Sequence, residues 1–195
     1  MENETELILK YKEMVLKNQN LDANMVNKLF NIDDKILSQL SDAANEITRT
    51  FQGSKIDVEQ LANIKKNYCS EDCTFCSQSA FFDTGIDKYQ LMSAEEVVRQ
   101  ATDAKKAGAH SYCLVAAWRE PNHTDFEKVC KIIDEINTKV GISVECSLGF
   151  LTETQARMLK TLGVKRYNHN LETSRSKFRE ICSTHTYEDR VNTLK

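Results

Sequence analysis

From about residue 56 to its last residue, the chain alternates between short apolar segments and amphipathic ones. Strand-like apolar runs are predicted at 58–64, 112–118, 142–148 and 164–169. Helical patterns stand between these runs, and each ends at a glycine, at Gly108, Gly141 and Gly163. Strands that alternate with helices over short connections form parallel βα units. The sequence therefore predicts an α/β fold with its functional residues in the loops that follow the strands.

Helix starts are marked by polar residues that can cap a helix N-terminus. Ser93 with Glu96 and Thr124 with Glu127 have the spacing of a capping box, and Thr152 with Gln155 opens a further helix. Ser174 and Thr186 begin two last helical segments. These signals set the expected boundaries of the helices that cover the sheet.

The first 55 residues lack this alternation. Apolar residues recur at helical spacing in three segments there, at 5–17, 25–30 and 33–51. The charged residues between them form no catalytic grouping. The sequence predicts a helical extension over residues 1–55 that precedes the α/β domain of residues 56–195.

Composition and charge exclude several classes of partner. The longest nearly uncharged apolar run, 112–118, is far shorter than the roughly 20 residues that span a bilayer. The formal net charge is −3, and the lysines and arginines are scattered rather than gathered as in nucleic-acid-binding proteins. The acidic N-terminus lacks the basic and apolar regions of a signal peptide. We expect a cytoplasmic protein that binds no membrane and no nucleic acid.

Three cysteines, Cys69, Cys73 and Cys76, stand in a CxxxCxxC arrangement just after the first predicted strand. A [4Fe–4S] cluster normally takes four thiolates, so three converging thiols would leave one iron open for chemistry. A structural zinc site usually needs a second ligand pair, and no second CxxC occurs. Disulfides need an oxidising compartment, and seven is an odd count. A redox CxxC would leave Cys69 unexplained. The pattern favours the iron–sulfur cluster.

A second polar grouping, residues 168–173, follows the fourth predicted strand, and residues 119–122 follow the second. Such residues also cap helices, but the run of asparagines with Glu172 exceeds what a cap needs. We interpret both groups as parts of one site at the strand ends.

These blocks resemble the biotin synthase family of the radical S-adenosylmethionine superfamily. The superfamily signature is CxxxCxxC with an aromatic residue, here Phe75, before the last cysteine. Four further blocks are similar to biotin synthases in particular, at 112–119, 145–149, 167–174 and 184–190. The similarity runs from about residue 33 to Lys195.

The resemblance implies a sulfurtransferase that inserts sulfur into dethiobiotin to form biotin. Cys69, Cys73 and Cys76 would hold a [4Fe–4S] cluster, and its open iron would bind S-adenosyl-L-methionine, whose reductive cleavage yields the radical that attacks dethiobiotin. The remaining matches are Phe75 beside the adenine, Asn170 and Glu172 on the ribose, Arg190 at the methionyl carboxylate, and Asn168 with Asn170 toward dethiobiotin.

In this family a second cluster, [2Fe–2S], supplies the sulfur, and its ligands match Cys113 and Cys146. A lone buried cysteine usually behaves as a small hydrophobe, but the flanking motifs favour ligands here. Cys130 is predicted to lie in the core, and Cys182 matches no family ligand. His110, His123 and His185 are predicted as surface or capping residues, whereas His169 is expected to orient its neighbours in the site.

The family forms a complete (β/α)₈ barrel, typically of about 250 residues. Only about four βα units are predicted here, so we expect a partial TIM-type barrel, the N-terminal portion of a biotin synthase without the last cysteine and the arginine of the second cluster. The resemblance also implies a homodimer that accepts electrons from a flavodoxin- or ferredoxin-type donor. The alternatives are a related radical enzyme with another substrate, a non-catalytic fragment, or a half-barrel that needs a separate C-terminal partner.

Overall fold

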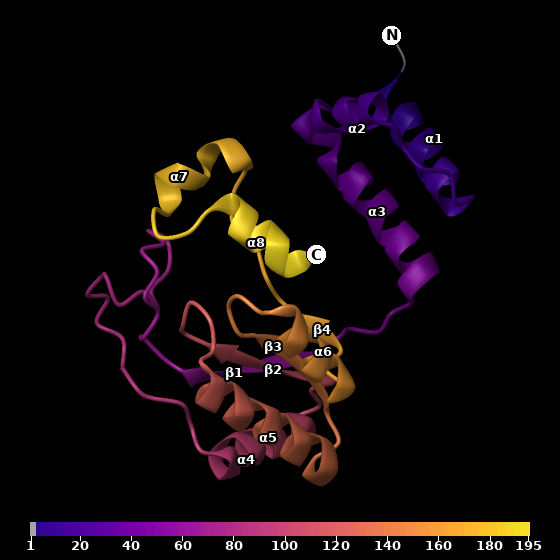
Figure 1. Cartoon of the computed structure of the whole chain (residues 1–195). Helices are drawn as coiled ribbons and strands as arrows, with labels where there is room; N and C mark the ends of the chain where they lie inside the picture. The colour runs from indigo at the N-terminus through magenta and orange to yellow at the C-terminus, as the bar shows by residue number, and fades with distance from the viewer. Residues whose placement is uncertain (1–2) are drawn as a thin grey trace. The chain divides into compact units, whose positions relative to one another are not determined.

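The computed structural model describes residues 3–195 and divides the chain into two compact units (Figure 1). The first unit ends at Ile56, and the second comprises Asp57–Lys195. Among the described residues, no helix combines the length and apolarity needed to cross a membrane.

The first unit is helical, as predicted. Its elements are α1 (Glu4–Leu16), α2 (Ala23–Phe30), a 3₁₀ turn (Asp34–Ile36) and α3 (Leu37–Gln52). Asn3 and Asp22 cap the first two helices by accepting backbone N–H bonds with their side chains. Helix α1 packs on α3 through Leu7, Ile8 and Ala43, because this apolar stripe can be buried only against another helix.

The second unit is built on one parallel sheet, which confirms the predicted α/β fold. The strands are β1 (Glu59–Lys65), β2 (Ser111–Ala116), β3 (Ser143–Ser147) and β4 (Arg166–Tyr167), in the order β1-β2-β3-β4. The connecting helices are α4 (Ala94–Lys106), α5 (His123–Lys139) and α6 (Glu153–Thr161). Helices α4 and α5 lie on one face of the sheet (Figure 1).

The register of the strands assigns each side chain to one of two faces. Successive residues of a strand point to opposite sides, so Leu114 and its partner Cys146 share a face, and Cys113 and its partner Glu145 share the other. The first face packs on α4 and α5 and forms the core, with Val97 and Ile133 fully buried against it. The second face corresponds to the interior of the barrel.

The C-terminal segment returns to the loop that follows β1. It contains a 3₁₀ turn (Arg175–Lys177), α7 (Phe178–Ile181) and α8 (Tyr187–Leu194). Phe178 and Cys182 form a small second core with Cys73 from the β1 loop. The amide of Thr74 donates to the carbonyl of Ile181 at 3.0 Å, so the cysteine loop is bonded directly to α7.

Some local predictions were wrong in detail. Helix α5 starts one residue before Thr124, because the Asn122 side chain accepts the Asp125 N–H at 2.8 Å and caps the helix there. Strand β4 has two residues rather than the six expected for 164–169.

Two helices begin with a complete capping box. The boxes of Thr152 with Gln155 and of Thr186 with Asp189 have both reciprocal bonds.

Candidate active site

A pocket lies at the carboxyl ends of the four strands, where the loops of a parallel sheet meet. The loops after β1, β2, β3 and β4 all contribute to its wall, together with α8. The predicted site residues that line it are Cys69, Phe75, Cys73, Cys76, Asn168, Asn170, Glu172 and Arg190. Residues more than 100 positions apart in the sequence are therefore brought together at one edge of the sheet.

Backbone hydrogen bonds fold the cysteine loop back on itself. Ala80 N–H donates to the carbonyl of Cys69 at 2.8 Å, and Cys76 N–H donates to the carbonyl of Cys73 at 3.0 Å. Burial raises the pKa of the Cys69 thiol, and burial with the neighbouring Cys182 raises that of Cys73 to about 12. Three unpaired thiols on one pocket wall fit the ligand set of a [4Fe–4S] cluster, whose binding would release their protons.

Two acidic residues between the cysteines anchor this loop to residues 183–185. Asp72 accepts the backbone N–H groups of Ser183 at 2.9 Å and Thr184 at 3.1 Å, as well as the Ser183 hydroxyl. These hydrogen bonds from Ser183 hold the pKa of Asp72 well below its usual range. The anchor sets where the cysteines stand relative to α8.

Glu71, the other acidic residue, is buried and ionised. Burial alone would raise its pKa, but hydrogen bonds from Thr184, His185 and Arg119 outweigh burial and lower it. The Arg119 Nη1 atom donates to Glu71 at 3.2 Å and to the Thr184 carbonyl at 3.2 Å. A buried carboxylate with a guanidinium partner thus ties the loop after β2 to the cysteine loop.

His185 was predicted as a surface or capping residue, and that prediction was wrong. The residue is 3% exposed, and its ring donates through Nδ1 to Glu71 and accepts at Nε2 from Arg190 at 3.1 Å. Glu71 and His185 were missed as site residues. The sequence offered one signal for each residue: Glu71 stands inside the cysteine motif, and His185 stands inside the block 184–190.

Arg190 places a positive charge beside the cysteines. It donates to the carbonyl of Asn170 at 2.9 Å, lies 3.5 Å from the Glu172 carboxylate and contacts Cys73 Sγ at 3.9 Å. Glu172 adopts a left-handed backbone with φ of 68°, which is uncommon for a residue with a side chain. Such conformations cluster at functional sites.

His169 lies beside Asn168 and Asn170, between the rings of Phe150 and Tyr167. Burial, with the nearby Arg190 and His185, lowers its pKa to about 4. Its Nε2 atom is buried without a hydrogen-bond partner. The ring is therefore neutral at physiological pH and positions its neighbours by packing.

Gly149 allows the loops after β2 and β3 to approach each other. A Cβ atom there would stand 2.1 Å from the carbonyl oxygen of Arg119, and its φ of 74° also favours glycine. Phe150 N–H donates to the same carbonyl at 2.8 Å. The close contact keeps Arg119 directed at Glu71.

The strand register directs the two strand cysteines, which are predicted as ligands of one cluster, to opposite faces of the sheet. Cys113 faces the barrel interior, where the Asn168 amide lies 3.5 Å from its sulfur. Cys146 is paired with Leu114 on the opposite face and is fully buried in the helix-covered core. The residue beside Cys113 on its own face is Glu145, because β3 places adjacent residues on opposite faces.

Comparison with known proteins identifies the family. The model of the radical SAM superfamily matches residues 63–195. The chain belongs to the radical SAM superfamily. Its resemblance to biotin synthases is confirmed by curated relatives: it is 68% identical to the biotin synthase of Nitrosopumilus maritimus over 97% of this chain and 58% of that protein.

Further known proteins are similar to this chain. Identity is 68% to the biotin synthase of Cenarchaeum symbiosum, over 82% of this chain and 50% of that one, and 38% to that of Clostridium tetani, over 96% and 58%. The chain thus spans between half and three fifths of these relatives. The crystal structure of methylornithine synthase matches with a TM-score of 0.80 at 19% identity, over 94% of this chain and 54% of that one, and shows the same fold.

Proposed function

We propose that this chain carries the part of a biotin synthase that binds the radical-generating cluster and S-adenosylmethionine. The observation that carries the proposal is the shared pocket of Cys69, Cys73 and Cys76 with Arg190. High identity to biotin synthases supports the choice of reaction over other radical SAM reactions. The reaction would be insertion of sulfur into dethiobiotin.

In this proposal the three loop thiolates hold the [4Fe–4S] cluster. When bound, the cluster supplies the electron that cleaves S-adenosylmethionine. Glu71 and Asp72 keep the loop in position through their bonds to residues 183–185. The chain itself contributes a partly buried loop, fixed by these bonds, that holds the three thiols in one pocket.

The remaining pocket residues would bind S-adenosylmethionine by its polar groups. Arg190 pairs with the methionyl carboxylate, since a guanidinium and a carboxylate form strong paired hydrogen bonds. Asn170 and Glu172 accept from the ribose hydroxyls, and Phe75, which is 54% exposed at the pocket wall, covers the adenine. Asn168 and Asn170 would contact dethiobiotin.

The likeness to biotin synthases supports Cys113 and Cys146 as ligands of the second, sulfur-donating [2Fe–2S] cluster. The strand register directs Cys113 to the barrel interior and Cys146 to the helix-covered face, so Cys113 is the one that faces the substrate side.

We further propose that the protein works in the cytoplasm, as a homodimer, with a flavodoxin- or ferredoxin-type electron donor. These three points rest on the likeness to biotin synthases alone. The dimer is tested by measuring the mass of the protein in solution, and the donor by reduction kinetics.

Anaerobic reconstitution tests the proposed function. We expect about four irons per chain and an electron paramagnetic resonance signal of the reduced protein that changes on adding S-adenosylmethionine. Arg190→Ala should weaken that change while retaining the iron. A folded chain that takes up no iron, or whose signal ignores S-adenosylmethionine, would contradict the proposal. The choice of substrate is tested separately, by whether dethiobiotin alters the electron paramagnetic resonance signal of the reduced protein in the presence of S-adenosylmethionine.

A further inference from the structure

His185 lies between two groups that each have a single role in hydrogen bonding. Its Nδ1 atom contacts the carboxylate of Glu71, and its Nε2 atom lies 3.1 Å from Nε of Arg190. An ionised carboxylate only accepts hydrogen bonds, and a guanidinium only donates them. The ring is therefore neutral, with its proton on Nδ1 and the lone pair of Nε2 directed at Arg190.

Glu71 is held in its accepting role from several sides. Arg119 Nη1 donates to its two carboxylate oxygens at 3.2 and 3.3 Å, and the Thr184 hydroxyl donates to it at 2.8 Å. The residue is buried, so these donors, rather than water, orient the carboxylate. The carboxylate consequently stays directed at Nδ1 of His185.

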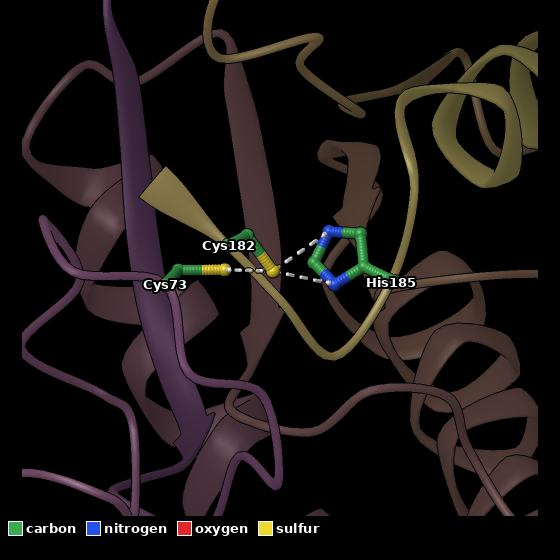
Figure 2. A group of neighbouring side chains, drawn as sticks. All are labelled: Cys73, Cys182 and His185. Carbon is green, nitrogen blue, oxygen red and sulfur yellow. Dashed lines mark hydrogen bonds between the residues drawn. The ribbon is translucent and has the colours of Figure 1, made fainter. Parts of the chain in front are cut away.

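The ring of His185 is also fixed by its neighbours. Phe150 and Phe178 make edge-to-face contacts with it, at centroid distances of 5.2 and 5.4 Å. Cys182 lies between the ring and Cys73, with its sulfur 3.2 Å from Nδ1 (Figure 2). These neighbours restrict rotation of the ring, so its Nε2 atom keeps facing the guanidinium.

Arg190 is oriented by this contact and by two more. Its Nη1 atom donates to the carbonyl of Asn170 at 2.9 Å, and Nη2 contacts Cys73 Sγ at 3.9 Å. Each terminal nitrogen of a guanidinium carries two N–H groups, so both nitrogens keep a second N–H for a ligand. Arg190 thus reaches the pocket already ordered, with donors left for an anionic group.

We propose that Glu71 and His185 are positioning residues for Arg190, and that this Glu71–His185–Arg190 network sets how tightly the pocket binds the carboxylate of S-adenosylmethionine. The inference rests on the proposed function, in which Arg190 pairs with that carboxylate. A long side chain loses rotamer freedom when it binds a ligand, and a side chain ordered beforehand avoids that loss. The network therefore strengthens binding without touching the ligand.

Two variants of His185 test the proposal. His185→Leu removes both ring nitrogens, whereas His185→Gln keeps a donor for Glu71 and an acceptor for Arg190. After anaerobic reconstitution, both should take up about four irons per chain. S-adenosylmethionine is then titrated against the electron paramagnetic resonance signal of the reduced protein. We expect its Kd to rise about tenfold in His185→Leu and to return to within about threefold in His185→Gln.

Cys182→Ala is the matched control for lost packing. The Cys182 side chain is buried against the same ring, but its thiol donates to Asp72 at 3.2 Å and stands outside the Glu71–His185–Arg190 network. We expect a Kd for S-adenosylmethionine within about twofold of that of the unmodified chain. Circular dichroism verifies that each variant is folded.

A second measurement needs neither cluster nor ligand. In the cluster-free chain with ¹⁵N-labelled histidine, the ring signals that disappear in His185→Gln identify His185. Their nuclear magnetic resonance pattern should be that of a neutral ring with its proton on Nδ1. A proton on Nε2 would overturn the proposal, because the ring could not then accept from Arg190.

The outcomes separate this inference from the proposed function. Equal Kd values in His185→Leu and the unmodified chain, or no recovery in His185→Gln, would overturn the inference alone. An equal rise in Cys182→Ala would do the same, because packing would then explain the effect, as would a folded His185→Leu that takes up no iron. A signal that ignores S-adenosylmethionine in the unmodified chain would contradict the proposed function, and this inference with it.

Discussion

The two groups of cysteines differ in what holds them together. Cys69, Cys73 and Cys76 lie in one short loop whose turns direct them to a single pocket. Cys113 and Cys146 lie on neighbouring strands, where the register decides their directions and separates them across the sheet. Spacing within a loop is therefore good evidence for convergence. Spacing between strands is evidence only after the pairing is known, because a shift of one residue reverses the face.

The largest expected effect concerns the loop group. Cys76→Ser should reduce bound iron after reconstitution from about four to well below one per chain, because two thiolates cannot hold the cluster. Cys130→Ala, on α5 and outside the pocket, is the matched control and should retain the iron. Iron and sulfide analysis measures both. Equal iron in Cys76→Ser and the unmodified chain would remove the distinction between the two cysteine groups.

The loop group should also depend on its acidic anchor. Asp72→Ala deletes the acceptor of several bonds from Ser183 and Thr184, and hydrogen bonds to a charged group contribute about 1.5–3 kcal/mol. We expect a loss of about 2 kcal/mol in unfolding free energy and faster amide exchange at Ser183 and Thr184. Asp83→Ala, at an exposed acidic residue of the same loop, should change unfolding by a few tenths of a kcal/mol.

The loss of unfolding free energy on replacing Cys113 or Cys146 should depend on the face of the sheet to which each side chain points. Cys146→Ser would bury a hydroxyl in the helix-covered core, at a cost of roughly 1–3 kcal/mol. Cys113→Ser should cost less, since the Asn168 amide can donate to the new hydroxyl. Urea denaturation of the two variants measures the difference. A larger loss for Cys113→Ser would indicate that the assignment of faces is wrong.

The smallest effect is a pH dependence from His169. Its folded pKa of about 4 lies below the usual value of 6.5, so the unfolded chain binds more protons between these values. Stability contributed by the neutral ring is complete above about pH 6.5 and is lost as the pH falls toward 4. We expect a loss of about 1 kcal/mol from pH 7 to pH 5, allowing for partial exposure.

His169→Asn tests that assignment. The variant should show a flatter pH dependence of unfolding free energy over the same range, measured by urea denaturation at each pH. An unchanged slope would assign the effect to His185, whose pKa burial also lowers.

Much of the fold and part of the site followed from local pattern. Apolar periodicity predicted the helices of both units and the four strands, because burial of an apolar face is a local requirement. The cysteine spacing and the polar run 168–173 were correctly expected to meet at the strand ends. The start of α5 was missed because Asn122 and Thr124 are both good caps, and the structure uses Asn122.

The sequence by itself determined the parallel α/β architecture, the cysteine loop and the superfamily, since these depend on residue type and near spacing. Only the tertiary structure decided that Cys146 lies in the core and Glu145 beside Cys113. It also brought Cys182 and His185 to Cys73, more than 100 residues away along the chain. The physical reason is that such contacts depend on strand register and on how the C-terminal segment packs, and neither is encoded in the spacing of neighbouring residues.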